Sequence, residues 1–439
     1  MKIFNYPTNW KALLERPQLE TKALEEKVKV ILENIQQNGN EAVQAYTEQF
    51  DGVLLENFQV TEAEMEAAKK QVPVALQEAI KVAKDNIEKF HAAQQEVITE
   101  VETTPGIICW RKSVGIEKVG LYIPAGTAPL FSTVLMLGVP AKLAGCEEIV
   151  LCSPPEKDGS INPVILYTAA LVGCTQIFKI GGVQAIGAMA YGTETVPAVY
   201  KIFGPGNQYV TCAKQTVSQE GVAIDLPAGP SELLVWADAD ANPDFVAADL
   251  LSQAEHGADS QVMLVSDTIQ VLEQTQAALK RQLEALPRKE IAQAALENSR
   301  AILLKTNTKI LDFINAYAPE HLILNLKDAE TWATKIINAG SVFIGAYTPE
   351  SLGDYASGTN HTLPTSAYAK SYSGVSLDSF VKKITFQKAS AAGLKNIGWA
   401  VEAMAAAEAL QAHKNAVTIR LKTLQNQSSE EDVLTLSKL

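Results

Sequence analysis

The residues that decide the fold are VGLYIPAGTAPLFSTVLMLGVPAKLAGCEEIVLC, numbers 119–152. Residues 119–124 form a short apolar run that predicts a buried strand, and residues 148–152 predict a second one. Residues 133–144, between the two runs, predict a helix. A strand, a helix and a strand in this order indicate an α/β fold with a parallel sheet that helices cover.

The same alternation continues along the chain. Helices are predicted at 163–172, where Pro163 suits the first helical position, and at 184–191, and strands at 176–180 and 199–203. A second run of strands is predicted at 232–236, 261–265, 301–304, 321–324 and 341–344, with helices between them. Two sheet systems follow, with residues 226–230 as their junction.

The two ends of the chain have a different pattern. Residues 20–37 and 62–95 carry apolar side chains at three- and four-residue spacing, which predicts helices over most of the first hundred residues. After residue 376 the pattern becomes helical again, and an alanine-rich helix is predicted at 397–412. We expect this tail to be an appendage rather than a third core.

Size and charge exclude several classes of protein. The 439 residues are 47% hydrophobic and 20% charged, which is typical of a globular protein with two or more domains. A formal net charge of −13 argues against a nucleic-acid partner, because a phosphate backbone requires a basic face. The N-terminus has no apolar run of signal-peptide length, and other apolar runs break long before about 18 residues. We therefore expect no membrane partner.

The cysteines indicate a reducing compartment. There are five, and no two form a C-x-x-C pair: Cys109, Cys146, Cys152, Cys174 and Cys212. An odd number of scattered cysteines favours neither a disulfide framework nor a thiolate metal site. A cytoplasmic location is therefore expected, with the cysteines acting as small buried side chains.

The histidines are few, and four of the five lie in the second half of the chain. Gln253 and His256 are three positions apart near the end of a predicted helix, which places them on one face. An amide oxygen beside an imidazole suits a divalent metal ion with mixed nitrogen and oxygen ligands. An exposed polar helix end explains the same two residues equally well.

Three further groups of residues could contribute to a pocket. Glu320 and His321 directly precede an apolar strand and offer two acid–base groups of different intrinsic pKa. The glycine-bracketed loop from Asp354 to His361 adds a carboxylate and an imidazole, although a solvated loop is as good a reading. Glu408 and His413 are five positions apart, so the helix must end between them if both line one pocket.

Phosphate-binding signals are weak. The chain has no G-x-G-x-x-G and no Walker loop. Residues 181–184 (GGVQ) and 204–207 (GPGN) follow predicted strands, and each could direct backbone N–H groups toward a pyrophosphate. Glycines at such turns are also common for conformational reasons alone.

Taken together, eight segments in the right order resemble histidinol dehydrogenase over essentially the whole chain. They are VGLYIP at 119–124, KIGGVQAI at 179–186, FGPGN at 203–207, IDLPAGPSE at 224–232, the helix end at 253–256, Glu320-His321, the loop at 354–361 and AHKNAV at 412–417. One departure is Pro124-Ala125-Gly126, where the family usually has Pro-Gly-Gly.

The resemblance implies a reaction and its groups. The reaction is oxidation of L-histidinol to L-histidine, through an enzyme-held histidinaldehyde, by two hydride transfers to NAD. One zinc ion per subunit would anchor the substrate's imidazole and amino nitrogens. By position, the zinc ligands would be Gln253, His256, Asp354 and His413; Ser231, His321, His361 and Glu408 would join them in binding the substrate; Tyr122, Gln184 and Asn207 would contact NAD.

The resemblance also implies a homodimer of Rossmann-like subunits. The expected division is an N-terminal arm at 1–25, a first Rossmann-like domain at 26–113 with 229–375 that carries most metal and catalytic residues, a second doubly wound domain on the NAD side at 114–228, and a helical dimer-contacting tail at 376–439. The family's active sites are shared between subunits, so Glu408 and His413 would serve the partner's site.

The chemistry of the acid–base pair agrees with this reaction. Removing a hydride from an alcohol needs a base for the hydroxyl proton, and His321 suits that near neutral pH. Water must then add to the aldehyde, and Glu320 is a suitable base for that water. Two alternatives stay open: aldehyde oxidation through a thiohemiacetal on Cys146 or Cys152, and a metal-dependent binding protein without turnover.

Overall fold

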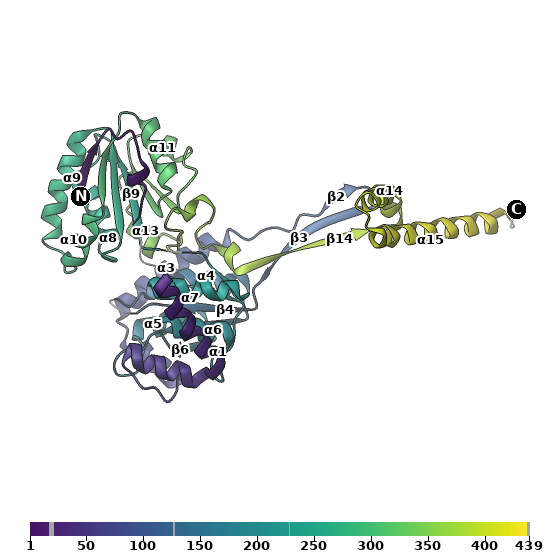
Figure 1. Ribbon diagram of the computed structural model, residues 1–439, viewed down its shortest axis with the longest axis horizontal. Coiled ribbons are helices and arrows are strands. Elements are labelled where there is room, and N and C mark those ends of the chain that lie inside the picture. Colours follow the sequence, from purple (N-terminus) through teal and green to yellow (C-terminus); the bar gives the residue numbers. More distant parts are fainter. Residues whose placement is uncertain (17–21, 126–127, 228, 437–439) are drawn as a thin grey trace. The chain divides into compact units, whose positions relative to one another are not determined.

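The computed structural model describes residues 1–16, 22–125, 128–227 and 229–436, and forms two compact units (Figure 1). The first unit comprises Met1–Gln94 and Gly115–Phe380, and the second comprises Gln95–Val114 and Val381–Leu439. Gly126 and Ala228, which belong to two of the quoted motifs, lie outside the described residues, as do positions 17–21 of the predicted arm and 437–439 of the predicted tail.

The smaller sheet of the first unit has the order β6-β5-β4-β7-β8, and every neighbouring pair is parallel. Its strands are β4 (Lys118–Tyr122), β5 (Glu148–Ser153), β6 (Gln176–Lys179), β7 (Lys201–Phe203) and β8 (Ala223–Ile224). The helices that follow them in the chain are α4 (Phe131–Ala144), α5 (Pro163–Val172), α6 (Gly182–Tyr191) and α7 (Gln208–Gln219). Strand order reverses between β4 and β7, which is the arrangement of a doubly wound sheet.

The larger sheet has the order β1-β11-β10-β9-β12-β13 and is also parallel throughout. Its strands are β1 (Lys2–Asn5), β9 (Glu232–Ala237), β10 (Gln261–Ser266), β11 (Arg300–Leu303), β12 (His321–Asn325) and β13 (Ser341–Ile344). Its helices are α8 (Pro243–Ala254), α9 (Ile269–Leu283), α10 (Lys289–Glu297), α11 (Asn307–Tyr317), α12 (Ala329–Ala333) and α13 (Glu350–Tyr355). The predicted α/β class with two doubly wound parallel sheets is confirmed.

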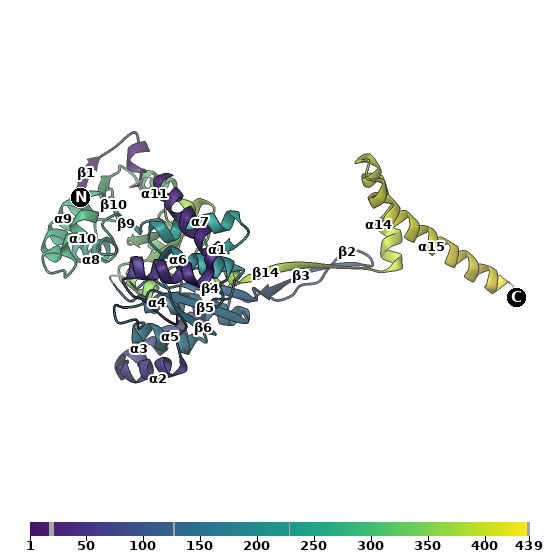
Figure 2. The same cartoon turned by 60° about the horizontal axis from the view of Figure 1, so that its bottom comes forward.

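The N-terminal helices pack on the smaller sheet's side of the first unit (Figure 2). They are α1 (Lys22–Asp51), α2 (Glu62–Gln71) and α3 (Val74–Ala92). Leu32 and Ile35 of α1 approach Gly187 of α6 so closely that a Cβ there would lie 2.8 Å from Ile35 Cδ1. This packing differs from the predicted grouping of residues 26–113 with 229–375, because the apolar face of α1 complements α6. The first strand, β1, lies within the predicted N-terminal arm and pairs with β11 of the larger sheet.

The second unit contains a three-stranded sheet with the order β14-β3-β2, made of β2 (Val101–Thr104), β3 (Ile107–Gly115) and β14 (Val381–Ala389). Two helices complete it, α14 (Ala391–Ala407) and α15 (Gln411–Leu436). The tail is helical in α14 and α15, as predicted, but it also contains the strand β14, where Phe386 stacks on Trp110 with ring centroids 5.3 Å apart. Short 3₁₀ helices span Lys11–Leu13, Tyr368–Lys370 and Leu377–Phe380.

None of the helices within the described ranges is both long enough and apolar enough to cross a membrane.

Candidate active site

Glu320 and His321 lie where β12 begins, beside the start of β9. The parallel register pairs His321 with Leu233, so Glu320 lies next to Glu232. These two strands flank the point at which the order of the larger sheet reverses. The site therefore lies at the amino ends of the strands, whereas ligands in open α/β sheets usually bind at the carboxyl ends.

The Glu320 carboxylate is held by backbone and side-chain donors. Its Oε2 accepts the N–H of Glu232 at 2.8 Å and lies 3.4 Å from Gln253 Nε2. The same oxygen is 3.5 Å from His321 Nδ1. Only 6% of Glu320 is exposed, so these donors replace the water that the buried carboxylate has lost. One oxygen of the carboxylate is thus fixed in place.

His321 has a partner at each ring nitrogen. Nε2 lies 3.2 Å from Asp354 Oδ1, while Nδ1 lies 3.3 Å from the Glu232 carbonyl oxygen and 3.0 Å from Gln253 Nε2. Burial by itself would lower the pKa of His321, but the carboxylates of Glu320 and Asp354 raise this pKa well above its ordinary value. The surroundings therefore stabilise the imidazolium that forms when His321 accepts a proton.

Asp354 lies near three of the chain's histidines. Burial raises the pKa of its carboxyl, but the hydrogen bond and charge of His321, together with His361 and His256, bring the pKa below its usual value. Asp354 is therefore ionised at neutral pH, which is the form that a metal ion binds.

Gln253 is the strongest structural indication of a bound ligand. It lies near the C-terminal end of α8, is 1% exposed, and its Oε1 has no hydrogen-bond partner in the described chain. Because a buried carbonyl oxygen without a partner is costly, this atom is suited to a metal ion. Gln253, His256 and Asp354 therefore fit the predicted zinc ligands in residue chemistry.

His256 lies beyond α8, because the helix already ends at Ala254. The prediction that Gln253 and His256 share a helix face was therefore wrong in detail. A turn joins them instead, in which the His256 N–H donates to the Gln253 carbonyl at 3.3 Å. The described residues contain no group of three or more His, Cys, Asp or Glu side chains arranged around one metal position.

Glu408 and His413, the two predicted site residues in the C-terminal tail, belong to the second unit. Glu408 ends α14, Ala409 has a left-handed φ of 59°, and His413 lies in the next helix, α15. The helix thus ends between Glu408 and His413, as a shared pocket would require. The first unit by itself contains neither residue.

His361 is held in one tautomer. Its Nδ1 lies 2.9 Å from the carbonyl oxygen of Asp354, which can only accept, so Nδ1 carries the proton. Nε2 then accepts from Thr133 Oγ1 at 3.0 Å. Burial lowers the pKa of His361 and favours this neutral form. Thr133, on α4 of the smaller sheet, is a site residue that sequence analysis missed, since no local signal links residues 228 positions apart.

Two of the predicted NAD contacts, Tyr122 and Gln184, each have a hydrogen-bond partner in the first unit. Tyr122 Oη accepts the N–H of Gly182 at 3.2 Å, and Gln184 Nε2 donates to Asp51 Oδ2 at 3.1 Å. Burial raises the pKa of Asp51 to about 6. Asp51 also lines a hollow of about 670 Å³ with Ala125, Pro154, Pro155 and neighbouring residues.

Asn207, the third predicted NAD contact, caps α7 by accepting the N–H groups of Tyr209 and Val210 at 3.0 and 3.2 Å. Its loop approaches Tyr122 through Gly204, which has a φ of 129°. A Cβ at Gly204 would lie 2.1 Å from the Tyr122 carbonyl oxygen, so only glycine fits. Ser231, predicted to bind substrate, immediately precedes Glu232 at the start of β9.

The cysteine alternative finds little support in the structure. None of the five cysteines, all of which are described, forms a disulfide. Burial raises the pKa of Cys146 to about 11 and the pKa of Cys152 further still. Because the nucleophile is the thiolate, such buried thiols are poorly suited to attack an aldehyde.

Glu350, at the start of α13, is a buried acid that sequence analysis did not select. Ser252 Oγ donates to its Oε1 at 2.7 Å, and Oε2 has no hydrogen-bond partner among the described residues. Burial chiefly raises the pKa of Glu350 to about 8, with a smaller opposing effect of His321. The carboxyl is therefore largely protonated in the fold at neutral pH.

Glu350→Gln is expected to flatten the pH dependence of stability in the metal-free protein. A folded pKa above the unfolded one means that the fold loses stability as pH rises from about 4.5 through about 8. The loss is at most about 5 kcal/mol, since one pKa unit corresponds to about 1.4 kcal/mol. Glutamine cannot ionise, so this slope should disappear in urea unfolding series run between pH 5 and 8.5 with chelator present. The exposed Glu330→Gln is the control, and equal slopes for wild type and Glu350→Gln would contradict the expectation.

The chain has two doubly wound parallel sheets, and a buried carboxylate–imidazole pair lies where the strand order of one sheet reverses. These features define an α/β enzyme with an acid–base site. Comparisons with known proteins specify the enzyme further. The sequence profile of the family described as histidinol dehydrogenase matches residues 14–421. The histidinol dehydrogenase of Bacteroides thetaiotaomicron is 59% identical over 97% of this chain and 100% of its own length. That of Xylella fastidiosa is 54% identical over 90% of this chain and 92% of its own.

A solved structure agrees with the sequence comparisons. The crystal structure of histidinol dehydrogenase from Elizabethkingia anophelis matches with a TM-score of 0.95 and 55% identity, covering 97% of this chain and 99% of the other. The chain therefore belongs to the histidinol dehydrogenase family, and it is an oxidoreductase.

Proposed function

We propose that this chain oxidises L-histidinol to L-histidine through L-histidinaldehyde, with two molecules of NAD as hydride acceptors, in the last steps of histidine biosynthesis. Membership of the family supports the substrate. The observation that carries the mechanism is the buried Glu320–His321 pair, which is held by Glu232, Gln253 and Asp354.

His321 is proposed as the base that takes the hydroxyl proton when the alcohol is oxidised. Its Nε2 and Nδ1 face the carboxylates of Asp354 and Glu320, which stabilise the imidazolium after proton uptake. Glu320 is proposed as the base that deprotonates the water adding to the aldehyde. Because the Glu232 N–H holds one of its oxygens, the other oxygen is oriented for the water.

One zinc ion per subunit is proposed to be held by Gln253, His256, Asp354 and His413. When bound, it would anchor the imidazole and amino nitrogens of the substrate. Support comes from the buried, unpartnered Oε1 of Gln253 in the described chain and from the lowered pKa of the Asp354 carboxyl. Ser231, His361 and Glu408 are proposed to complete the substrate pocket, and Tyr122, Gln184 and Asn207 to contact NAD.

A homodimer is part of the proposal, because His413 and Glu408 belong to the second unit while the other site residues belong to the first. Each of these two residues would serve the partner's site. The unpaired state of all five cysteines supports the proposed cytoplasmic location.

The proposed function is tested by NADH absorbance in the presence of L-histidinol. We expect two NADH per histidinol with the zinc-loaded protein, loss of the signal after chelation, and recovery when zinc is returned. Omitting histidinol is the control. Absence of NADH with the zinc-loaded dimer would overturn the proposal, and binding of metal and histidinol without NADH would favour a binding protein.

A further inference from the structure

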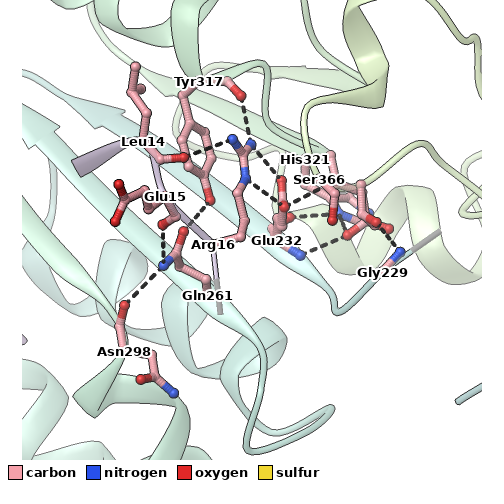
Figure 3. A network of polar contacts seen from close by, with 12 residues as sticks. Leu14, Glu15, Arg16, Gly229, Glu232, Gln261, Asn298, Tyr317, His321 and Ser366 are labelled. Atoms are coloured by element: carbon pink, nitrogen blue, oxygen red, sulfur yellow. Dashed lines mark hydrogen bonds and ion pairs between the residues drawn. The ribbon is translucent and has the colours of Figure 1, made fainter. Parts of the chain in front are cut away.

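Arg16 makes a set of contacts close to His321, one member of the proposed catalytic pair (Figure 3). Its Nε and Nη2 donate to the two carboxylate oxygens of Glu232 at 2.9 and 3.1 Å. The side chains are only 13% and 2% exposed, so this is a bidentate ion pair largely shielded from water. An ion pair with this geometry fixes the direction of the Glu232 side chain as well as its charge.

Glu232 in turn contacts both members of the catalytic pair through its backbone. Its N–H donates to Glu320 Oε2 at 2.8 Å, and its carbonyl oxygen lies 3.3 Å from His321 Nδ1. Its Oε1 also accepts the N–H of Ser366 at 2.8 Å. Arg16 and Ser366 therefore hold the side chain of a residue whose backbone orients Glu320 and His321.

Arg16 also contacts Tyr317, the last residue of α11. Arg16 Nη2 donates to the Tyr317 carbonyl at 2.6 Å, and the guanidinium carbon lies 3.8 Å from the centre of the Tyr317 ring. The next residue, Ala318, has a left-handed φ of 54°, which is uncommon for a residue with a Cβ. This turn lies two residues before Glu320. Arg16 therefore contacts both the segment that precedes the catalytic pair and the neighbouring strand, β9.

We propose that Arg16 is a positioning residue for Glu320 and His321. It acts through Glu232 on β9 and through the Tyr317 carbonyl that precedes β12. The inference deepens the proposed function, because it rests on the roles proposed there for the catalytic pair. Both contacts come from the single guanidinium group of Arg16.

Loss of the Arg16 guanidinium would change the electrostatic surroundings of two buried carboxylates at the site. Glu232 and Glu320 are two buried carboxylates on adjacent strands. Without the guanidinium, Glu232 would keep a buried charge with no cationic partner, and it would either take up a proton or turn away. Either change would release the side chain of Glu232, the residue whose backbone N–H orients Glu320. A small displacement of a catalytic group is enough to slow a reaction considerably.

Arg16→Met, Arg16→Lys and Arg300→Met form the test set. Arg300 is the matched control, because its Nη1 holds the same arm through the carbonyl oxygens of Leu13 and Glu15 at 2.6 and 3.0 Å rather than through Glu232. For the zinc-loaded full chain we expect Arg16→Met to lower kcat by roughly tenfold to a hundredfold, with a smaller change in KM for histidinol. Arg16→Lys, which keeps the charge but not the bidentate geometry, should fall between. Arg300→Met should reduce thermal stability but leave kcat within about twofold of wild type.

A second measurement needs no substrate. The chain has five histidines, so the imidazole resonances of histidine-labelled protein are few, and His321→Gln identifies the His321 signal. This signal should shift in Arg16→Met and stay in place in Arg300→Met. Should Arg16→Met fail to fold, Arg16→Lys carries the same comparison.

The outcomes distinguish a failure of the proposed function from a failure of the positioning role of Arg16. If wild type produces no NADH from histidinol, the proposed function fails, and the His321 resonance still decides the role of Arg16. An unchanged His321 resonance in a folded Arg16 variant, a loss confined to KM, or an equal loss of kcat in Arg300→Met would each overturn the positioning role.

Discussion

Glu320→Gln is expected to lower kcat for oxidation of L-histidinaldehyde by roughly 10²- to 10⁴-fold, the range that a positioned general base contributes. Glutamine has nearly the same shape, and its carbonyl oxygen can still accept the Glu232 N–H that now binds Glu320 Oε2 at 2.8 Å. What is lost is the ability to remove a proton from the water that adds to the aldehyde. Oxidation of the alcohol should suffer much less, because His321 is the proposed base for that step.

The comparison is made within one variant. Histidinol and histidinaldehyde are supplied separately, and NADH formation is followed in single-turnover and steady-state experiments. The alcohol reaction is the internal control for folding, metal binding and NAD binding. Equal losses with both substrates would remove Glu320 from the water-activating role and leave it as a partner of His321.

Lys214→Met is expected to lower the free energy of unfolding by about 3–5 kcal/mol, the usual result of removing one partner of a buried ion pair. Lys214 Nζ lies 2.5 Å from Asp225 Oδ1, and the two side chains are 5% and 1% exposed. Nζ also donates to the Gly204 carbonyl at 2.8 Å, while Asp225 Oδ2 accepts the Gly204 N–H at 2.8 Å. Methionine fills much of the space but leaves Asp225 as a buried carboxylate without its cation.

Lys118→Met, at the start of β4 in the smaller sheet, is the matched control. Lys118 Nζ lies 2.8 Å from Glu148 Oε1, but these side chains are 27% and 34% exposed. A pair so open to solvent should contribute less than about 1 kcal/mol. Urea unfolding of both variants measures the difference, and NAD titration checks whether the Gly204 loop has moved. If Lys214→Met loses no more stability than Lys118→Met, the buried pair does not have the expected role.

Most strands of the two sheets could be predicted from the sequence, because hydrophobic periodicity is a property of neighbouring residues. β9, β10, β12 and β13 begin where the apolar runs begin. The two-residue strand β8 was missed because it is too short to show a period. β14 was missed because only three of its nine residues, VKKITFQKA, are large and apolar, and most of its side chains are exposed.

The candidate site was predictable only where its residues come in recognisable groups. Glu320-His321 and the 354–361 loop stand out in the sequence, and the structure brings them together with Gln253. Thr133 and Asp51 do not stand out, since each meets its partner across more than a hundred residues. Neither belongs to a polar cluster in the sequence that would mark it.

Local patterns in the chain were sufficient to identify the alternating strands and helices, the acid–base pair and the family resemblance, because each depends on residues close together or in a characteristic order. Folding alone decided that the site lies at the amino ends of β9 and β12, that α1 packs over α6, and that Arg16 meets Glu232, 216 positions away. The reason is physical. A buried ion pair depends on which surfaces the folded chain brings together, and spacing along the sequence carries no information about that contact.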